Sequence, residues 1–207
     1  GYSYRDWVGP YYPVGTSSSD FLAYYSGDFG ITELNFSYYR MPDTDMLARL
    51  TQKTPPAFRF VVKAHRSLTH EPTAHWQDDA ERFRDAVEPV SREGRLAGIL
   101  LQFPYSFHYT ARNRRYLASL TETLDRGGGT EPGGGTGVGE PSREPRQEVP
   151  LFVEYRNREW QRESVYEEMR RRRLALVVTD MPALRGLPDS SPVLTADRSY
   201  LRFHGRN

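Results

Sequence analysis

One strand-like stretch of the chain ends in side chains that can do chemistry. Residues 58–65 read Phe-Arg-Phe-Val-Val-Lys-Ala-His, and strand alternation puts Lys63 and His65 on the same face. A lysine can bind an anion, and a histidine titrates near neutral pH and can move a proton. Lys63 is unusual in this chain, because only two of the 28 lysine and arginine residues are lysines. We therefore expect a site at the carboxyl end of this strand.

Five more strand-like runs end in polar side chains. They cover residues 31–36, 98–103, 151–156, 174–180 and 200–204, with polar residues expected on one face and apolar residues on the other. The residues expected to carry acid–base chemistry are Glu33, His65, Glu154 and His204. The residues expected to bind a ligand are Asn35, Tyr38, Lys63, Gln102, Arg156, Asp180 and Arg202.

The composition of this set favours an anionic ligand. Its cationic groups are as numerous as its acidic ones, and Arg156 and Arg202 can each hold a phosphate or carboxylate through two parallel hydrogen bonds. We expect a pocket that binds, or acts on, a small phosphate- or carboxylate-bearing molecule. No cofactor and no metal ligand are predicted. A divalent metal stays open, because histidine, glutamate and aspartate are ligand types, although no spacing such as His-Glu-x-x-His supports it.

Three alternatives stand beside this interpretation. The charged side chains can form a structural network, with Glu33 pairing with Lys63 or Glu154 with Arg202. A second alternative is a metal-assisted phosphodiesterase or nuclease. A third is a non-catalytic module in which arginines 112, 114 and 115, or arginines 170 to 173, bind RNA or an acidic protein. Nucleic acid is not the favoured partner, because helical arginine runs next to glutamates are commonly solvated faces.

The elements that must position these residues alternate along the chain. Helical patterns at residues 43–52, 73–91, 111–124 and 160–173 lie between the strand-like runs, and Thr73 is a suitable N-cap for the second of them. This rhythm predicts an α/β fold of parallel strands joined by helices, hence a barrel or a doubly wound sheet. No glycine-rich fingerprint follows the first strand, which counts against dinucleotide binding. A barrel accounts for the polar faces, because the carboxyl ends of its strands meet at one mouth.

The remaining features of the sequence limit the possible functions. Residues 126–149 are rich in Gly, Pro, Thr and Glu, and we expect them to form a disordered insert remote from the mouth. The net charge is +1, there is no cysteine, and no apolar run is long enough to span a bilayer. We expect a cytoplasmic protein without a membrane partner.

Longer motifs are spread over nearly the whole chain. They comprise residues 1–9, Tyr12-Pro13, 33–42, 58–64, Thr69-His70, 102–104, 154–156, Trp160 and 202–206. These motifs resemble the YecE-like family (domain of unknown function seventy-two). The resemblance implies a TIM-type β/α barrel with a polar pocket at its C-terminal mouth, and it implies no established activity. Family members extend beyond both ends of this chain. We therefore expect one domain over residues 1–207, lacking the first strand and the last helix–strand unit of the barrel.

Overall fold

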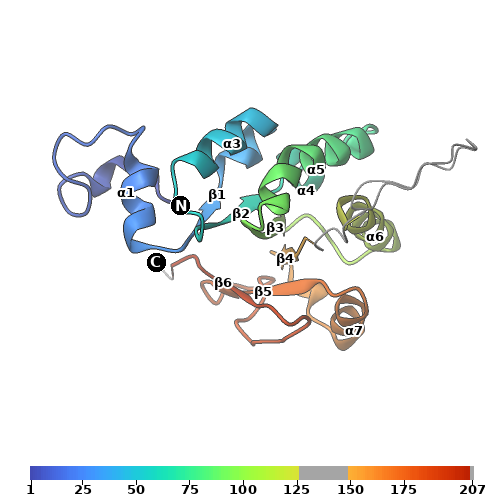
Figure 1. Cartoon of the computed structure of the whole chain (residues 1–207). Helices are drawn as coiled ribbons and strands as arrows, with labels where there is room; N and C mark the ends of the chain where they lie inside the picture. The colour runs from blue at the N-terminus through green and yellow to red at the C-terminus, as the bar shows by residue number, and fades with distance from the viewer. Residues whose placement is uncertain (126–148, 206–207) are drawn as a thin grey trace, which may run out of the picture.

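A computed structural model of the protein describes residues 1–125 and 149–205. Six parallel strands form one sheet and follow one another in sequence order. They are β1 (Ile31–Leu34), β2 (Arg59–Lys63), β3 (Leu96–Phe103), β4 (Leu151–Tyr155), β5 (Ala175–Asp180) and β6 (Tyr200–Phe203). The sheet curls into a half-barrel (Figure 1), which confirms the predicted α/β class and parallel strands. The predicted insert lies outside the described residues, apart from Val149.

The longer helices lie on the convex side of the curled sheet (Figure 1). The helices are α1 (Phe21–Asp28), α2 (Phe36–Tyr39), α3 (Thr44–Gln52), α4 (Arg66–Thr69), α5 (Trp76–Arg92), α6 (Ala111–Asp125) and α7 (Glu163–Arg171), with short 3-10 turns at Arg5–Trp7 and Arg158–Trp160. The four predicted helices correspond to α3, α5, α6 and α7. The N-cap expected at Thr73 was wrong, because α5 begins at Trp76. The Thr73 hydroxyl instead accepts a hydrogen bond from the backbone N–H of His75.

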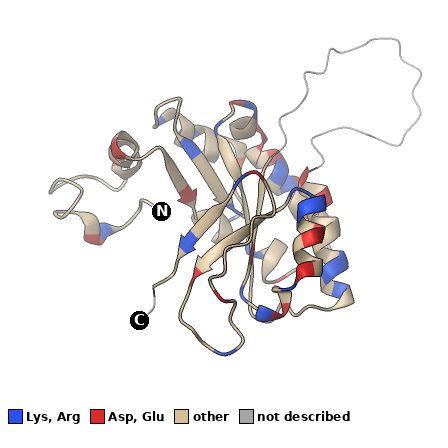
Figure 2. Ribbon diagram, turned by 90° about the horizontal axis from the view of Figure 1, so that it is seen from below, with Lys and Arg blue, Asp and Glu red and all other residues tan. Residues whose placement is uncertain are grey.

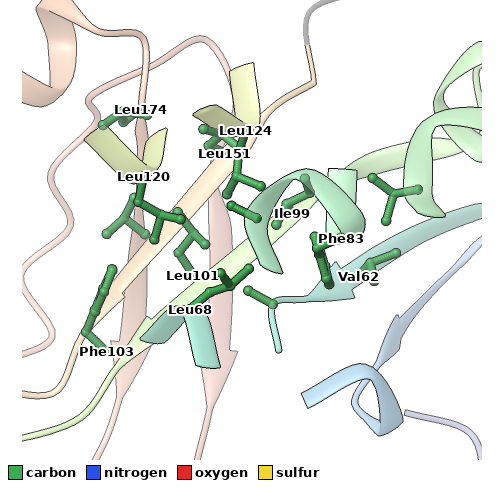
Figure 3. Packing of buried hydrophobic residues seen from close by; sticks show 14 of the residues in the cluster. Val62, Leu68, Phe83, Ile99, Leu101, Phe103, Leu120, Leu124, Leu151 and Leu174 are labelled. Atoms are coloured by element: carbon green, nitrogen blue, oxygen red, sulfur yellow. The ribbon is translucent and has the colours of Figure 1, made fainter. Parts of the chain in front are cut away.

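Strand alternation divides the apolar side chains into two layers. Val62 of β2 and Leu101 of β3 face the helices, where they gather with Phe83 of α5 and Leu120 of α6 in the main core (Figure 3). A second, smaller cluster lines the concave side and includes Val61, Leu100, Phe152, Ala175 and Val177. The concave side is therefore apolar along the strands and becomes polar only at their carboxyl ends.

The small concave layer depends on a glycine. A Cβ added at Gly98 would lie 2.3 Å from the Phe152 ring and 2.6 Å from the backbone oxygen of Pro150. We expect Gly98→Ala to destabilise the protein by about 1–3 kcal/mol, because the backbone of β4 cannot move without disturbing its pairing with β3. Gly27→Ala in α1 is the matched control. It meets no atom within 4 Å and should leave stability unchanged or raise it. Urea unfolding of both variants measures the difference, and equal midpoints would contradict the assignment.

No helix in the described residues is long and apolar enough to cross a membrane. The outer face of β6 is bare within the same part of the chain, where Leu201 and Phe203 are exposed.

Candidate functional site

Arg202 joins four strands at the carboxyl ends of the sheet. Its Nε and Nη2 atoms donate to the two oxygens of Glu33 on β1, at 3.0 and 2.9 Å. Its Nη1 atom donates to Gln102 Oε1 on β3 at 3.1 Å and also to Glu154 Oε2 on β4. Arg202 lies on β6, which is the edge strand opposite β1. One guanidinium therefore bridges the open sides of the half-barrel by side-chain contacts alone.

Glu33 is held in its ionised form. The hydroxyl of Tyr200, two residues before Arg202 and on the same face of β6, donates to Glu33 Oε2. Burial alone would raise the pKa of Glu33, but the charge of Arg202 and the hydrogen bonds from Tyr200, Arg202 and Asn35 outweigh it and lower this pKa. Glu33 is thus the ionised counter-ion of Arg202 at neutral pH.

Glu154 is the most deeply buried acid of the site, with no exposed surface. Besides Arg202 it faces Arg156, whose Nε lies 2.5 Å from Glu154 Oε1, and His204, whose Nε2 lies 3.5 Å from the same oxygen. Burial alone would raise its pKa, but His204 and the charges of Arg202 and Arg156 lower it to about 2. Glu154 Oε1 and Arg156 Nε lack a well-aligned hydrogen bond within the described residues, so their contact is an ion pair only.

Lys63 lies apart from this network, on an aromatic ring. Its ammonium is 4.4 Å from the centre of the Tyr38 ring, and His70 packs against the same ring edge-on at 4.9 Å. Within the part of the chain that the structure describes, Lys63 has no carboxylate within 4.0 Å. Burial lowers its pKa, and Arg202 and Arg156 lower it further against the opposing effect of Glu33 and Glu154. Burial also lowers the pKa of His70, to which Lys63 and Arg156 add.

The structure therefore brings together most of the predicted side chains. Those linked by hydrogen bonds, ion pairs or electrostatic contact are Glu33, Asn35, Tyr38, Lys63, Gln102, Glu154, Arg156, Arg202 and His204. They form two adjoining groups, which we call the Arg202 network and the Lys63 group. The Lys63 group consists of Lys63, Tyr38 and the unpredicted His70. The Arg202 network consists of the other residues named above together with Tyr200.

His65 does not join either group. The strand β2 ends at Lys63, and His65 is the N-cap of α4, where its Nδ1 accepts from the backbone N–H of Ser67 at 3.3 Å. Burial lowers the pKa of His65, and the charged side chains that act on it are Asp79, Arg66, Glu71 and Arg82. Within the described residues His65 thus contacts the first turn of α4 and no member of the Arg202 network.

Asp180 also departs from its expected position. Ala175 and Val177 face the concave side, so alternation places Asp180 with Leu176 on the side of the helices. Its backbone oxygen accepts from the N–H of His204 at 3.0 Å, which fixes the end of β6 beside it. The backbone of Asp180 thus helps to position His204 at the end of β6.

Two contributors were absent from the predicted set. Tyr200 is two residues before Arg202, so the alternation that selected Arg202 also points to it. His70 belongs to a motif of the family resemblance, but it follows a one-turn helix whose direction the sequence does not reveal. Both residues touch members of the predicted set.

The ion pair expected for a structural network is present between Glu154 and Arg202, and the metal and nucleic-acid alternatives stay predictions. No three His, Asp or Glu side chains among the described residues gather as metal ligands. Arg170 pairs with Glu163, and Arg171 and Arg172 pair with Glu168, so this run is largely neutralised on the helix surface (Figure 2). A cavity of about 990 Å³ lies near these arginines, at the amino-terminal ends of β4 and β5. Asp125 and Val149, which flank residues 126–148 in the sequence, line this cavity, and we assign it no function.

Comparison with known proteins agrees with the sequence motifs. The family model described as "Protein of unknown function DUF72" matches residues 1–207. The curated "UPF0759 protein YunF" of Bacillus subtilis (strain 168) is 26% identical over 207 residues. The match covers 95% of this chain and 66% of that protein, so the chain spans slightly less than two thirds of the relative's length.

Solved structures show the same fold. A DUF72 family protein from Thermotoga maritima MSB8 superimposes with a TM-score of 0.81 at 37% identity, covering 100% of this chain and 73% of the other. A DUF72 family protein from Enterococcus faecalis V583 gives a TM-score of 0.73 at 23% identity, covering 93% of this chain and 72% of the other. The second likeness supports the fold alone.

Proposed function

Because the chain belongs to the DUF72 family, a family of proteins of unknown function, its activity must be inferred from its own side chains, and we propose that it binds a small phosphate- or carboxylate-bearing anion. The observation that carries the proposal is Lys63. Its ammonium is partly buried on the Tyr38 ring without a carboxylate partner in the described residues. A buried cation is costly unless a counter-charge meets it, and a bound anion would supply that charge.

The balance of charge favours the same conclusion. Among the described side chains of the two groups, two carboxylates, Glu33 and Glu154, face three cations, Lys63, Arg156 and Arg202. Arg202 contacts both carboxylates, whereas Arg156 shares Glu154 with it. One positive charge is thus in excess, and it lies on the side of Lys63 and His70. An anion placed there would contact Lys63 and be within the field of Arg156.

The two acids are better suited to holding the arginines than to moving protons. Glu154, with a pKa of about 2, is a weak base at neutral pH, and the pKa of Glu33 is lowered as well. We therefore assign any acid–base step on the bound anion to His204 or His70. His204 lies beside Glu154 and Arg156, with its Nε2 3.2 Å from Arg156 Nη2. Glu33 and Glu154 then orient Arg202 and Arg156, which is a different role from the one predicted for them.

The proposed site also fits a wider architecture. Six parallel strands that follow one another in order and collect polar groups at their carboxyl ends are what a TIM-type barrel provides. We propose that these strands are part of such a barrel and that the anion binds at its mouth. The metal-assisted and nucleic-acid alternatives, and the cytoplasmic location, stay predictions.

Replacing the only lysine of the site tests the proposal. Inorganic phosphate should raise the melting temperature of the wild-type protein, and Lys63→Met should weaken phosphate binding by at least about tenfold, since it removes the direct counter-charge. Without phosphate, Lys63→Met should be as stable as wild type or more stable, because a buried ammonium is removed. Thermal-shift titration and calorimetry measure both effects.

The chain supplies its own control. Lys53 is the other lysine, and it donates to the Ser19 backbone oxygen on an exposed surface. Lys53→Met should bind phosphate as wild type does. The proposal is wrong if phosphate, a phosphorylated sugar and a dicarboxylate all fail to stabilise the wild-type protein, or if the two lysine variants lose binding equally.

A further inference from the structure

A second hollow lies on the other side of β4 from the anion site. It is a groove of about 380 Å³ between α6 and α7, within the range of about 300–1,000 Å³ typical of small-molecule sites. Leu117, Tyr155, Trp160 and Met169 give it an apolar lining. Tyr155 alternates with Glu154 along β4, so the groove and the Arg202 network are separated by the sheet.

The groove has a buried donor without an acceptor. Tyr155 is 5% exposed, its ring stacks on Trp160 with 4.5 Å between ring centres, and its hydroxyl has no hydrogen-bond partner within the described residues. Leaving a buried hydroxyl unpaired destabilises the folded state. Burial raises the pKa of Tyr155, so the hydroxyl stays protonated and can donate a hydrogen bond to an acceptor.

The rim of the groove carries an exposed cation, Arg115, without a side-chain partner in the described residues. Arg172 is held by Glu168 and Glu122, and Arg114 lies over the Tyr109 ring at 5.0 Å. Arg115, which also lines the groove, makes no side-chain hydrogen bond or ion pair in the described part of the chain. Its charge therefore has no counter-ion at the edge of an apolar hollow.

We propose that this groove binds a small amphipathic carboxylate that carries one oxygen acceptor within its apolar part. The apolar part packs on Trp160 and Met169, the carboxylate pairs with Arg115, and the internal oxygen accepts from Tyr155. Each part of the ligand matches one feature of the groove: its apolar lining, its unpaired cation or its unpaired hydroxyl. The proposal does not depend on phosphate binding at Lys63.

Fluorescence displacement tests the first part. The probe is 1-anilinonaphthalene-8-sulfonate, an amphipathic anion that fluoresces in apolar sites, and decanoate is the competitor. Ala118→Leu adds bulk inside the groove and should reduce probe binding at least about tenfold, whereas Ser119→Leu on the neighbouring face of α6 should not. Arg115→Gln should weaken decanoate binding about fivefold. Equal effects of the two leucine variants, or no displacement by decanoate, would overturn the proposal.

Tyr155→Phe tests the second part. At least one decanoate with a mid-chain keto group should bind the wild-type protein about fivefold more tightly than decanoate, and this preference should vanish in Tyr155→Phe. The variant should melt no lower than wild type, because an unpaired hydroxyl is removed. A keto preference that persists in the variant, or a lower melting temperature, would show that the Tyr155 hydroxyl does not donate to the bound ligand. Lys63→Met should leave decanoate binding unchanged, which separates this site from the anion site.

Discussion

Glu154→Gln is expected to lower the free energy of unfolding by about 3–5 kcal/mol at pH 7. Glutamine has nearly the same shape, so the change removes a charge without opening a cavity. Arg156 then loses the only carboxylate that it contacts within the described residues, and Arg202 keeps Glu33 alone. The cost is large because Arg156 and Arg202 stay partly buried while their fully buried counter-charge disappears, which is worse than removing a whole ion pair.

Urea unfolding at pH 7 measures the effect, and a surface pair provides the control. Glu163 pairs with Arg170 on the exposed side of α7 at 2.7 Å, and Glu163→Gln should cost less than about 1 kcal/mol. If Glu154→Gln costs no more than Glu163→Gln, the Arg202 network does not hold the half-barrel together. The m-value should be unchanged, because the folded state keeps its surface.

The strands were the most predictable part of the fold. Each predicted run overlaps an observed strand, because short apolar runs that end in polar residues leave few other interpretations. The helices α2 and α4 were missed for a physical reason. Each is a single turn of four residues, too short for a 3.6-residue period to emerge. The helix α1 was also missed, since its residues Phe21–Asp28 show no clear apolar stripe.

The site was predictable only as far as the strands extend. Alternation placed Glu33, Gln102, Glu154 and Arg202 on one face, and the structure brings these four side chains into contact. Alternation says nothing about residues beyond a strand end, which is why His65 lies elsewhere as a helix cap.

The partners within the site depend on the curl of the sheet. Glu33 was weighed as a partner of Lys63 on the neighbouring strand, yet it pairs with Arg202 on the opposite edge strand. The curl brings β6 within reach of β1 through a long guanidinium side chain. No pattern in the sequence measures this distance. The same contact leaves Lys63 without a carboxylate in the described residues and so creates the site that we propose.

Acid should unfold the protein through the same network that Glu154→Gln disrupts. The pKa of Glu154 falls from an ordinary 4.5 to about 2 in the folded protein. Its ionised form therefore stabilises the fold fully above pH 4.5, and this contribution is lost as the pH falls from 4.5 towards 2. A depression of this size corresponds to about 3 kcal/mol. Glu33 has a lowered pKa as well and acts in the same direction.

The histidines predict a separate and earlier loss. Burial lowers the pKa values of His65 and His70 below 6.5, so the folded state resists their protonation and stability declines as the pH falls below 6.5.

Unfolding free energies measured from pH 8 to pH 2 should show both steps. In Glu154→Gln the step below pH 4.5 should shrink and the histidine step should stay. In 0.5 M NaCl the wild-type step below pH 4.5 should largely persist, because salt screens buried pairs weakly. A step that salt abolishes would instead come from surface carboxylates, and the buried Arg202 network would then contribute little to acid stability.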